Sequence, residues 1–185
     1  MNAKVQIQLP EQLIPYYTAA DIIQSYSSAF ETTTQIKTLI NRIDKATAQI
    51  KIFAQEENAE CALFSELESL IAITKDLANC QLDTFKLECK RHNESNQDQY
   101  DAGDLLDAYS LAFETTSWLE TMLSQIKGEA CQIKEELEKH GISSAVFTTL
   151  EKIISIAEYL AQSQANAFDV EREKYENQWE ASKNE

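Results

Sequence analysis

The chain is poor in residues that interrupt regular structure. Its 185 residues include only three glycines and two prolines, which argues against a β-sandwich or a loop-rich fold. No run approaches the ~20 apolar residues of a membrane span. The first residues also lack the charged-then-apolar layout of a secretory signal. We therefore expect a cytoplasmic protein that does not bind membranes.

Residues that build reactive sites are equally sparse. Cys61, Cys80, Cys89 and Cys131 form no C-x-x-C motif, and neither histidine follows the Glu-x-x-His pattern of di-metal helical bundles. Three glycines cannot build a phosphate-binding loop, and no serine or cysteine nucleophile stands in a recognisable turn. The sequence therefore predicts free thiols, no metal, no cofactor and no enzymatic activity.

What the chain does contain is an internal repeat. Residues 21–94 align without a gap onto residues 104–177 at a constant offset of 83, and about a third of the aligned positions are identical. The clearest stretch is SYSSAFETTTQIKTLINRI at 25–43, which corresponds to AYSLAFETTSWLETMLSQI at 108–126. The repeat gives every position a counterpart with which it can be compared.

Each copy has the pattern of a long helical hairpin. Apolar residues recur at alternating steps of four and three over about five heptads, which is typical of helices packed along one face. The segments 18–21 and 101–104 resemble capping boxes, and Asn58 and Gly141 mark the hairpin turns. We predict an all-α, antiparallel four-helix bundle made of two tandem hairpins with pseudo-twofold symmetry and helices of roughly 35 residues. An open pair of hairpins that closes by dimerising is the alternative.

The expected organisation is a single domain. It comprises an extended arm at 1–17, hairpins at 18–94 and 104–177, a linker at 95–103 and a tail at 178–185. In the arm, Val5, Ile7 and Leu9 alternate with glutamines, as in an extended segment. The arm could pack along the bundle or pair with the arm of another chain.

Six polar residues occupy inward-looking positions in both copies: Tyr26 and Tyr109, Thr33 and Thr116, Gln81 and Gln164. A buried hydroxyl or amide without a partner costs about 1–3 kcal/mol. We therefore expect these groups to bond one another or the backbone and to fix the register of the hairpins. Their alternative role is to line a small-molecule cavity.

The copies differ most visibly in an apolar stripe. Ser28 and Gln35 of the first copy correspond to Leu111 and Trp118 of the second, and Met122 extends the same face. An apolar stripe present in only one copy is a candidate interface. The N-terminal arm, or Tyr175 and Trp179 near the C-terminus, could instead cover it.

The charge is also uneven. Residues 1–92 carry 12 acids and 9 bases, whereas residues 93–185 carry 19 acids and 7 bases. Such a field repels nucleic acid and attracts basic protein surfaces. We expect a non-catalytic protein-binding module whose partner has a basic surface or is a second copy of the chain. The alternatives are an acidic nucleic-acid mimic that inhibits a DNA- or RNA-binding protein, and a carrier of a small apolar ligand in the bundle core.

Overall fold

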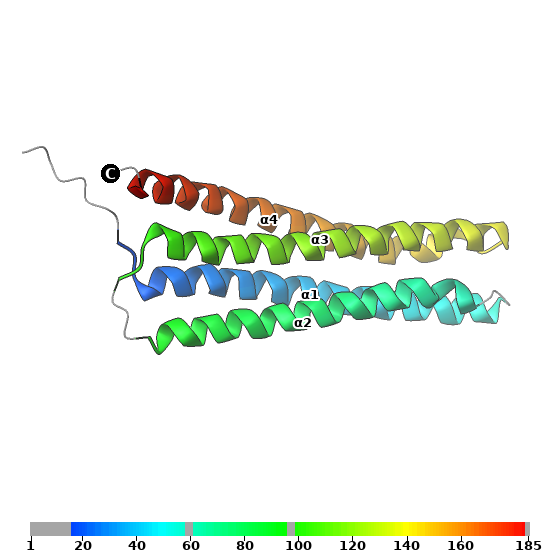
Figure 1. Ribbon diagram of the computed structural model, residues 1–185. Coiled ribbons are helices and arrows are strands. Elements are labelled where there is room, and N and C mark those ends of the chain that lie inside the picture. Colours follow the sequence, from blue (N-terminus) through cyan, green and yellow to red (C-terminus); the bar gives the residue numbers. More distant parts are fainter. Residues whose placement is uncertain (1–15, 58–60, 96–98, 184–185) are drawn as a thin grey trace, which may run out of the picture.

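A computed structural model describes residues 16–57, 61–95 and 99–183. Four long helices run back and forth along one axis (Figure 1). They are α1 (Ala19–Glu56), α2 (Ser65–Asn93), α3 (Ala102–Lys139) and α4 (Thr148–Lys183), with short 3₁₀ turns at Cys61–Phe64 and Ser144–Phe147. The prediction of an all-α four-helix bundle is confirmed. In the described part of the chain, no helix combines the length and apolar character needed to span a bilayer.

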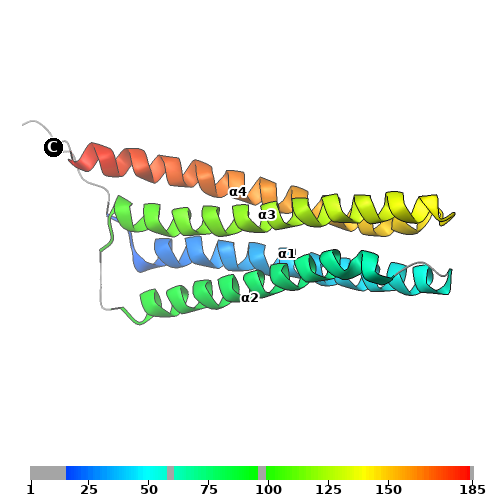
Figure 2. The ribbon, with the colours of Figure 1, turned by 45° about the vertical axis from the view of Figure 1, so that its right-hand side comes forward.

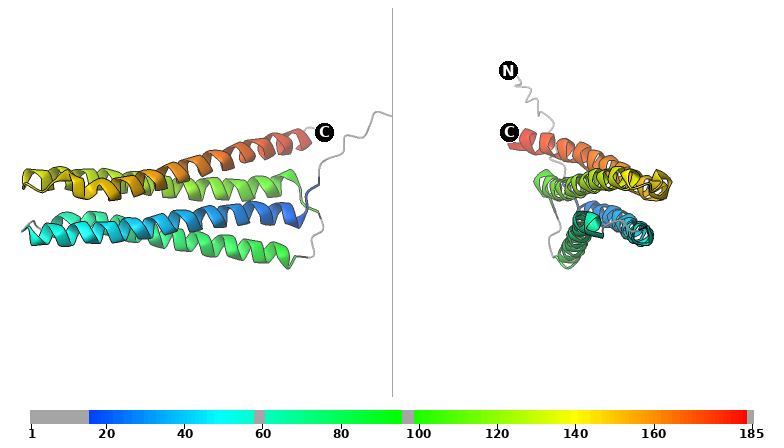
Figure 3. Two further views of the ribbon diagram at one scale, coloured as in Figure 1. Left: turned by 180° about the vertical axis from the view of Figure 1, so that it is seen from behind. Right: turned by 90° about the vertical axis from the view of Figure 1, so that its right-hand side faces the viewer.

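The bundle is flattened rather than square. α1 and α3 each pack against all three other helices, whereas α2 and α4 have no extended contact with each other in the described residues. Viewed from the end, the hairpin α1–α2 lies against the hairpin α3–α4 (Figure 3). α2 and α4 diverge from their partners toward their own C-terminal ends (Figure 2). α1 and α3 are therefore the inner helices, and α2 and α4 keep broader outer faces.

The helix starts and the second turn follow the predicted signals. The backbone N–H groups of Thr18 and Asp101 donate to the carboxylates of Asp21 and Asp104, at 2.8 and 3.0 Å. These groups complete the predicted capping boxes. Backbone and hydroxyl bonds from Thr18 lower the pKa of the Asp21 carboxyl. Gly141, with φ of 84°, ends α3 in the left-handed conformation that glycine tolerates best.

Some boundaries differ from the prediction. α2 has 29 residues rather than about 35, because a 3₁₀ turn precedes it. α4 continues to Lys183, through most of the segment predicted as a tail, because Trp179 packs beside Gly103 at the start of α3. Asn58 and the alternating residues of the predicted arm lie outside the described residues. The pseudo-twofold relation between the hairpins remains a prediction.

The core is divided along the bundle into two apolar clusters. The larger extends from Ile36 and Leu119 to the hairpin turns, and the smaller surrounds Tyr26, Phe85 and Phe168 at the other end. Between them lies a layer of polar side chains from all four helices, which we call the polar layer. It consists of Thr32, Thr33, Gln81, Thr115, Thr116 and Gln164.

Among the residues that the structure describes, two ion pairs join the helices of each hairpin. Lys51 of α1 lies 2.7 Å from Glu68 of α2, and at the equivalent positions Lys134 of α3 lies 2.6 Å from Glu151 of α4. The second pair is reversed between the hairpins. Asp44 on α1 pairs with Lys75 on α2, whereas Lys127 on α3 pairs with Glu158 on α4.

Candidate protein-binding surface

The predicted stripe on α3 divides into one exposed residue and two partly covered ones. The Trp118 side chain keeps 52% of its surface exposed at the middle of the helix. Leu111 is half-buried and packs against the smaller core cluster, while Met122 is also half-buried. Leu111 therefore contributes to the core, and Trp118 is the residue of the stripe most available to another molecule.

From the register of the neighbouring helix α2, we infer that α2 extends this apolar surface. The side-chain amide of Gln81 on α2 donates to the carbonyl oxygen of Thr115 on α3, at 2.9 Å, and thereby fixes the register of the two antiparallel helices. One turn along α3 from this contact is Trp118, and one turn back along α2 is Leu77. One further turn along each helix lie Met122 on α3 and Ile73 on α2. The Ile73 side chain is 56% exposed. We call Ile73, Leu77, Trp118 and Met122 together the Trp118 surface.

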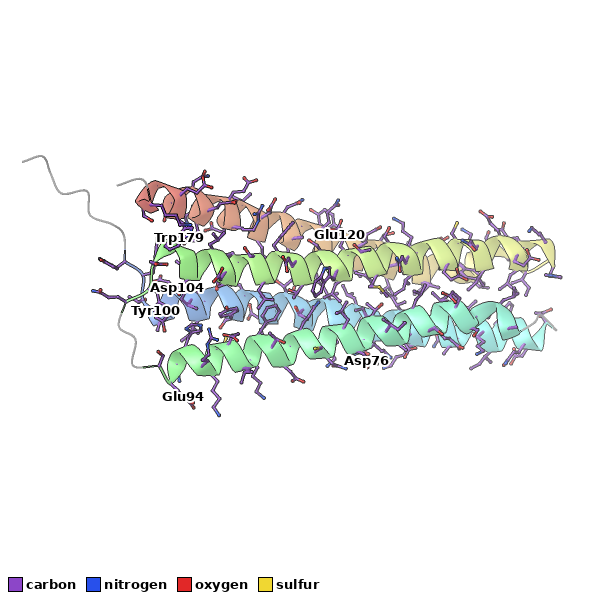
Figure 4. All side chains as sticks on the ribbon, viewed as in Figure 1. Asp76, Glu94, Tyr100, Asp104, Glu120 and Trp179 are labelled. Atoms are coloured by element: carbon purple, nitrogen blue, oxygen red, sulfur yellow. The ribbon has the colours of Figure 1, made fainter. Side chains whose placement is uncertain are left out.

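The C-terminal aromatic residues do not cover Trp118. The Tyr175 ring packs against Tyr109, with ring centroids 5.5 Å apart. A Cβ atom on Gly103 would lie 3.2 Å from the Trp179 ring, so Trp179 packs against the first turn of α3. Trp179 and Tyr100 lie near the same end of the bundle (Figure 4). Whether the N-terminal arm covers the stripe lies outside the described residues.

The polar layer is only partly hydrogen-bonded. Besides the contact between Gln81 and Thr115, the Thr32 hydroxyl donates to the Gln164 side-chain oxygen at 3.3 Å. Both contacts join one hairpin to the other. The buried hydroxyls of Thr33 and Thr116 have no hydrogen-bond partner among the described groups. The two glutamines therefore link the hairpins, whereas the two threonines are buried at an energetic cost.

Tyr26 and Tyr109 lie outside this layer, in an aromatic arrangement that the sequence analysis missed. Tyr17 and Tyr100 precede α1 and α3, and each donates its backbone N–H to the carbonyl of the other, at 2.9 and 3.0 Å. Each ring then packs into the opposite hairpin. The Tyr100 ring packs edge-on against His92 of the first hairpin, and the Tyr17 ring packs edge-on against Tyr175 of the second hairpin. We call this arrangement the tyrosine clasp. Its sequence signal was available, because Tyr17 and Tyr100 share the offset of the repeat.

His92 is the one titratable imidazole within the described core. Its ring stacks on Tyr26 with centroids 5.9 Å apart, and its Nδ1 lies 3.1 Å from the Tyr100 hydroxyl. Burial lowers the pKa of His92 below 6.5, and Arg91 lowers it further, while Glu88 and Asp104 act in the opposite direction. Burial also raises the pKa of the Tyr26 hydroxyl to about 12. The folded protein therefore keeps His92 neutral at neutral pH.

Acidification is expected to destabilise the protein through His92. The unfolded chain takes up a proton near the ordinary histidine pKa, whereas the folded chain does so only at lower pH, so folding free energy is lost as the pH falls through about 6.5. His92→Tyr introduces the residue found at the equivalent position, Tyr175. This variant should show a smaller fall in unfolding midpoint between about pH 7 and about pH 5. His140 is present in both proteins, so the comparison isolates the effect of residue 92. Equal pH dependence in denaturant titrations would contradict the prediction.

In the segments that the structure describes, no group of three or more His, Cys, Asp or Glu side chains is arranged to hold a metal ion. The Trp118 surface offers an exposed indole with aliphatic neighbours, and Glu114 lies exposed one turn away. Comparisons with models of known protein families, with curated proteins and with solved structures find no match to this chain.

Proposed function

We propose that this chain is a non-catalytic protein-binding module whose contact is centred on Trp118. The observation that supports this function is the half-exposed indole in the middle of a 38-residue helix. Tryptophan is among the residues that most often dominate binding energy at protein interfaces. Because Gln35 occupies the equivalent position on α1, the fold itself does not require a large aromatic side chain there.

The charge of the second half supports a basic partner. Glu114 and Asp107 are exposed on α3, and residues 93–185 carry 19 acids against 7 bases. Complementary charge at the rim of an interface raises association rates, while buried anchors supply most of the affinity. The proposed partner therefore presents lysine or arginine residues around an apolar recess that receives Trp118. A cytoplasmic setting is part of this proposal.

The test is affinity capture from the native host, followed by a binding titration with the purified partner. Trp118→Gln gives the second copy the residue that the first copy has at the equivalent position, Gln35. It should weaken binding by a factor of about 30 or more, as expected for a dominant interface residue. The matched control is Tyr159→Asp, which replaces an exposed aromatic residue on α4 by its counterpart Asp76. This control should bind with unchanged affinity.

Three other outcomes would redirect the proposal. If light scattering shows a dimer that Trp118→Glu converts to a monomer, the partner is a second copy of the chain. If nucleic acid displaces the captured protein, and Trp118→Gln leaves the affinity unchanged, the acidic-mimic function is favoured instead. Loss of binding in both Trp118→Gln and Tyr159→Asp would mean that the contact is not centred on Trp118.

A further inference from the structure

A groove lies between the two helices of the first hairpin. Between α1 and α2, a hollow of about 380 Å³ is lined by Ser27, Phe30, Glu31, Lys86 and Cys89. A second hollow of about 300 Å³ adjoins it and shares Phe30 and Lys86. Because they share these two residues, we describe the two hollows together as the Phe30 groove. Each part reaches the lower range of volumes found for small-molecule sites.

In the second hairpin, a side chain lies over the phenylalanine that corresponds to Phe30. The Arg172 guanidinium lies over the Phe113 ring, 5.4 Å from its centroid. Ion pairs at 2.7 Å to Asp169 and 3.4 Å to Glu176 hold it there. In the first hairpin, Cys89 stands at the position of Arg172, and Phe30 remains 36% exposed. The Phe30 groove is open because a short thiol has replaced the arginine that would cover it.

The charges around the groove are also reversed. Lys86 stands at the position of Asp169, and Lys37, which lines the adjoining hollow, stands at the position of Glu120. Glu120 projects from α3 on the side of α4 (Figure 4). In the described residues, neither lysine has a carboxylate within ion-pair distance. On a protein of net charge −15, Lys86 thus borders both hollows, and Lys37 borders the more polar of the two.

The lining of the first hollow is largely apolar. The Cys89 thiol is half-buried and points toward α1, with its sulfur 3.7 Å from the Ser27 hydroxyl and 4.0 Å from the Ile23 carbonyl oxygen. A thiol in this position behaves as a small apolar surface. The Phe30 ring forms the adjacent wall. Glu31 and Asp83 also line the two hollows, so the anion-binding part of the groove is confined to the lysine side.

We propose that the Phe30 groove binds a small amphipathic anion, with its apolar body on Phe30 and Cys89 and its negative head group on Lys86 and Lys37. Three independent changes relative to the second hairpin favour this ligand: the covering arginine is lost, and two acidic positions have become lysines. An aromatic acid and a fatty acid share the required chemistry. This site lies outside the Trp118 surface, so it does not depend on the proposed protein-binding function.

The probe is anilinonaphthalene sulfonate, an aromatic monoanion whose fluorescence rises in apolar sites, titrated into the full chain. Decanoate should displace it, and decanol, with the same chain but no charge, should be about tenfold weaker or worse. Cys89→Arg combined with Lys86→Asp transfers the residues of the second hairpin into the groove. It should reduce affinity for both anions by about tenfold or more. Circular dichroism establishes that the variant is folded.

The reverse exchange keeps the test decisive if that variant does not fold. Arg172→Cys combined with Asp169→Lys should open an equivalent groove over Phe113 and add a second binding site. Trp118→Gln is the matched control for adsorption to the other apolar surface and should bind the anions as the parent protein does. The proposal is overturned if the parent protein does not bind them, if the groove exchange leaves affinity unchanged, or if decanol competes as well as decanoate.

Discussion

The second hairpin produced alone, as residues 99–183, will form a homodimer rather than a folded monomer. Its inner face contains Leu105, Leu119 and Leu123, each at most 1% exposed in the full chain. Full burial of one such side chain contributes about 1.5–3 kcal/mol. Exposure of this face would therefore remove most of the stability of a small two-helix unit. A second copy of the hairpin can restore the burial, because Thr115 and Tyr100 match Thr32 and Tyr17 of the missing hairpin.

Sedimentation and circular dichroism at two protein concentrations test this result. Helicity should rise with concentration, together with a shift from monomer to dimer. A Leu119→Asp variant of the same fragment is the control and should be unfolded at both concentrations, because it places an unpaired charge in the seam. A monomer with full, concentration-independent helicity would contradict the prediction. It would show that each hairpin is stable without the other.

Replacing Thr33 and Thr116 together by valine will stabilise the full chain. Both hydroxyls are buried in the polar layer without a partner among the described groups. A buried hydroxyl in this state costs about 1–3 kcal/mol, which valine avoids at nearly the same shape. The double variant should therefore unfold at a higher denaturant concentration, with an unchanged slope of free energy against denaturant.

Thr115→Val provides the matched control one position away. The Thr115 hydroxyl donates to the Leu111 carbonyl oxygen at 2.7 Å, so its removal should be neutral or destabilising by about 1 kcal/mol. Chemical denaturation of the three proteins separates the outcomes. If the double variant is less stable than the parent, Thr33 and Thr116 contribute an interaction that their surroundings in the structure do not reveal.

The sequence was sufficient for the helices because each determinant is local. The heptad spacing from Ile22 to Ala54 and the capping carboxylates Asp21 and Asp104 act within one or two turns of the chain. Gly141 likewise ends α3 through its own backbone conformation. The length of α2 and the end of α4 were harder to predict, since they depend on a 3₁₀ turn and on the contact of Trp179 with Gly103.

The candidate sites were less predictable because they depend on which residues from distant segments meet. Periodicity placed Leu111 and Trp118 on one stripe, but only packing shows that Leu111 joins the core while Trp118 remains exposed. The Phe30 groove could not be predicted from the sequence, because its interpretation depends on the position of Arg172 over Phe113 in the other hairpin. Repeat comparison identified the altered positions, whereas their consequence depends on side-chain geometry.

The reversed ion pair gives the two hairpins a means of self-recognition during folding. A chain that contains similar helices twice can mispair them, with α1 joining α4 and α3 joining α2. In such a misfolded form Asp44 would face Glu158, and Lys127 would face Lys75, so both cross-pairs would carry like charges. Each such contact is unfavourable by only a few tenths of a kcal/mol. The correct arrangement has an attractive charge pair at each of these positions, which widens the difference in free energy between the two arrangements. The polarity of one ion pair thus marks each helix as belonging to its own copy of the repeat.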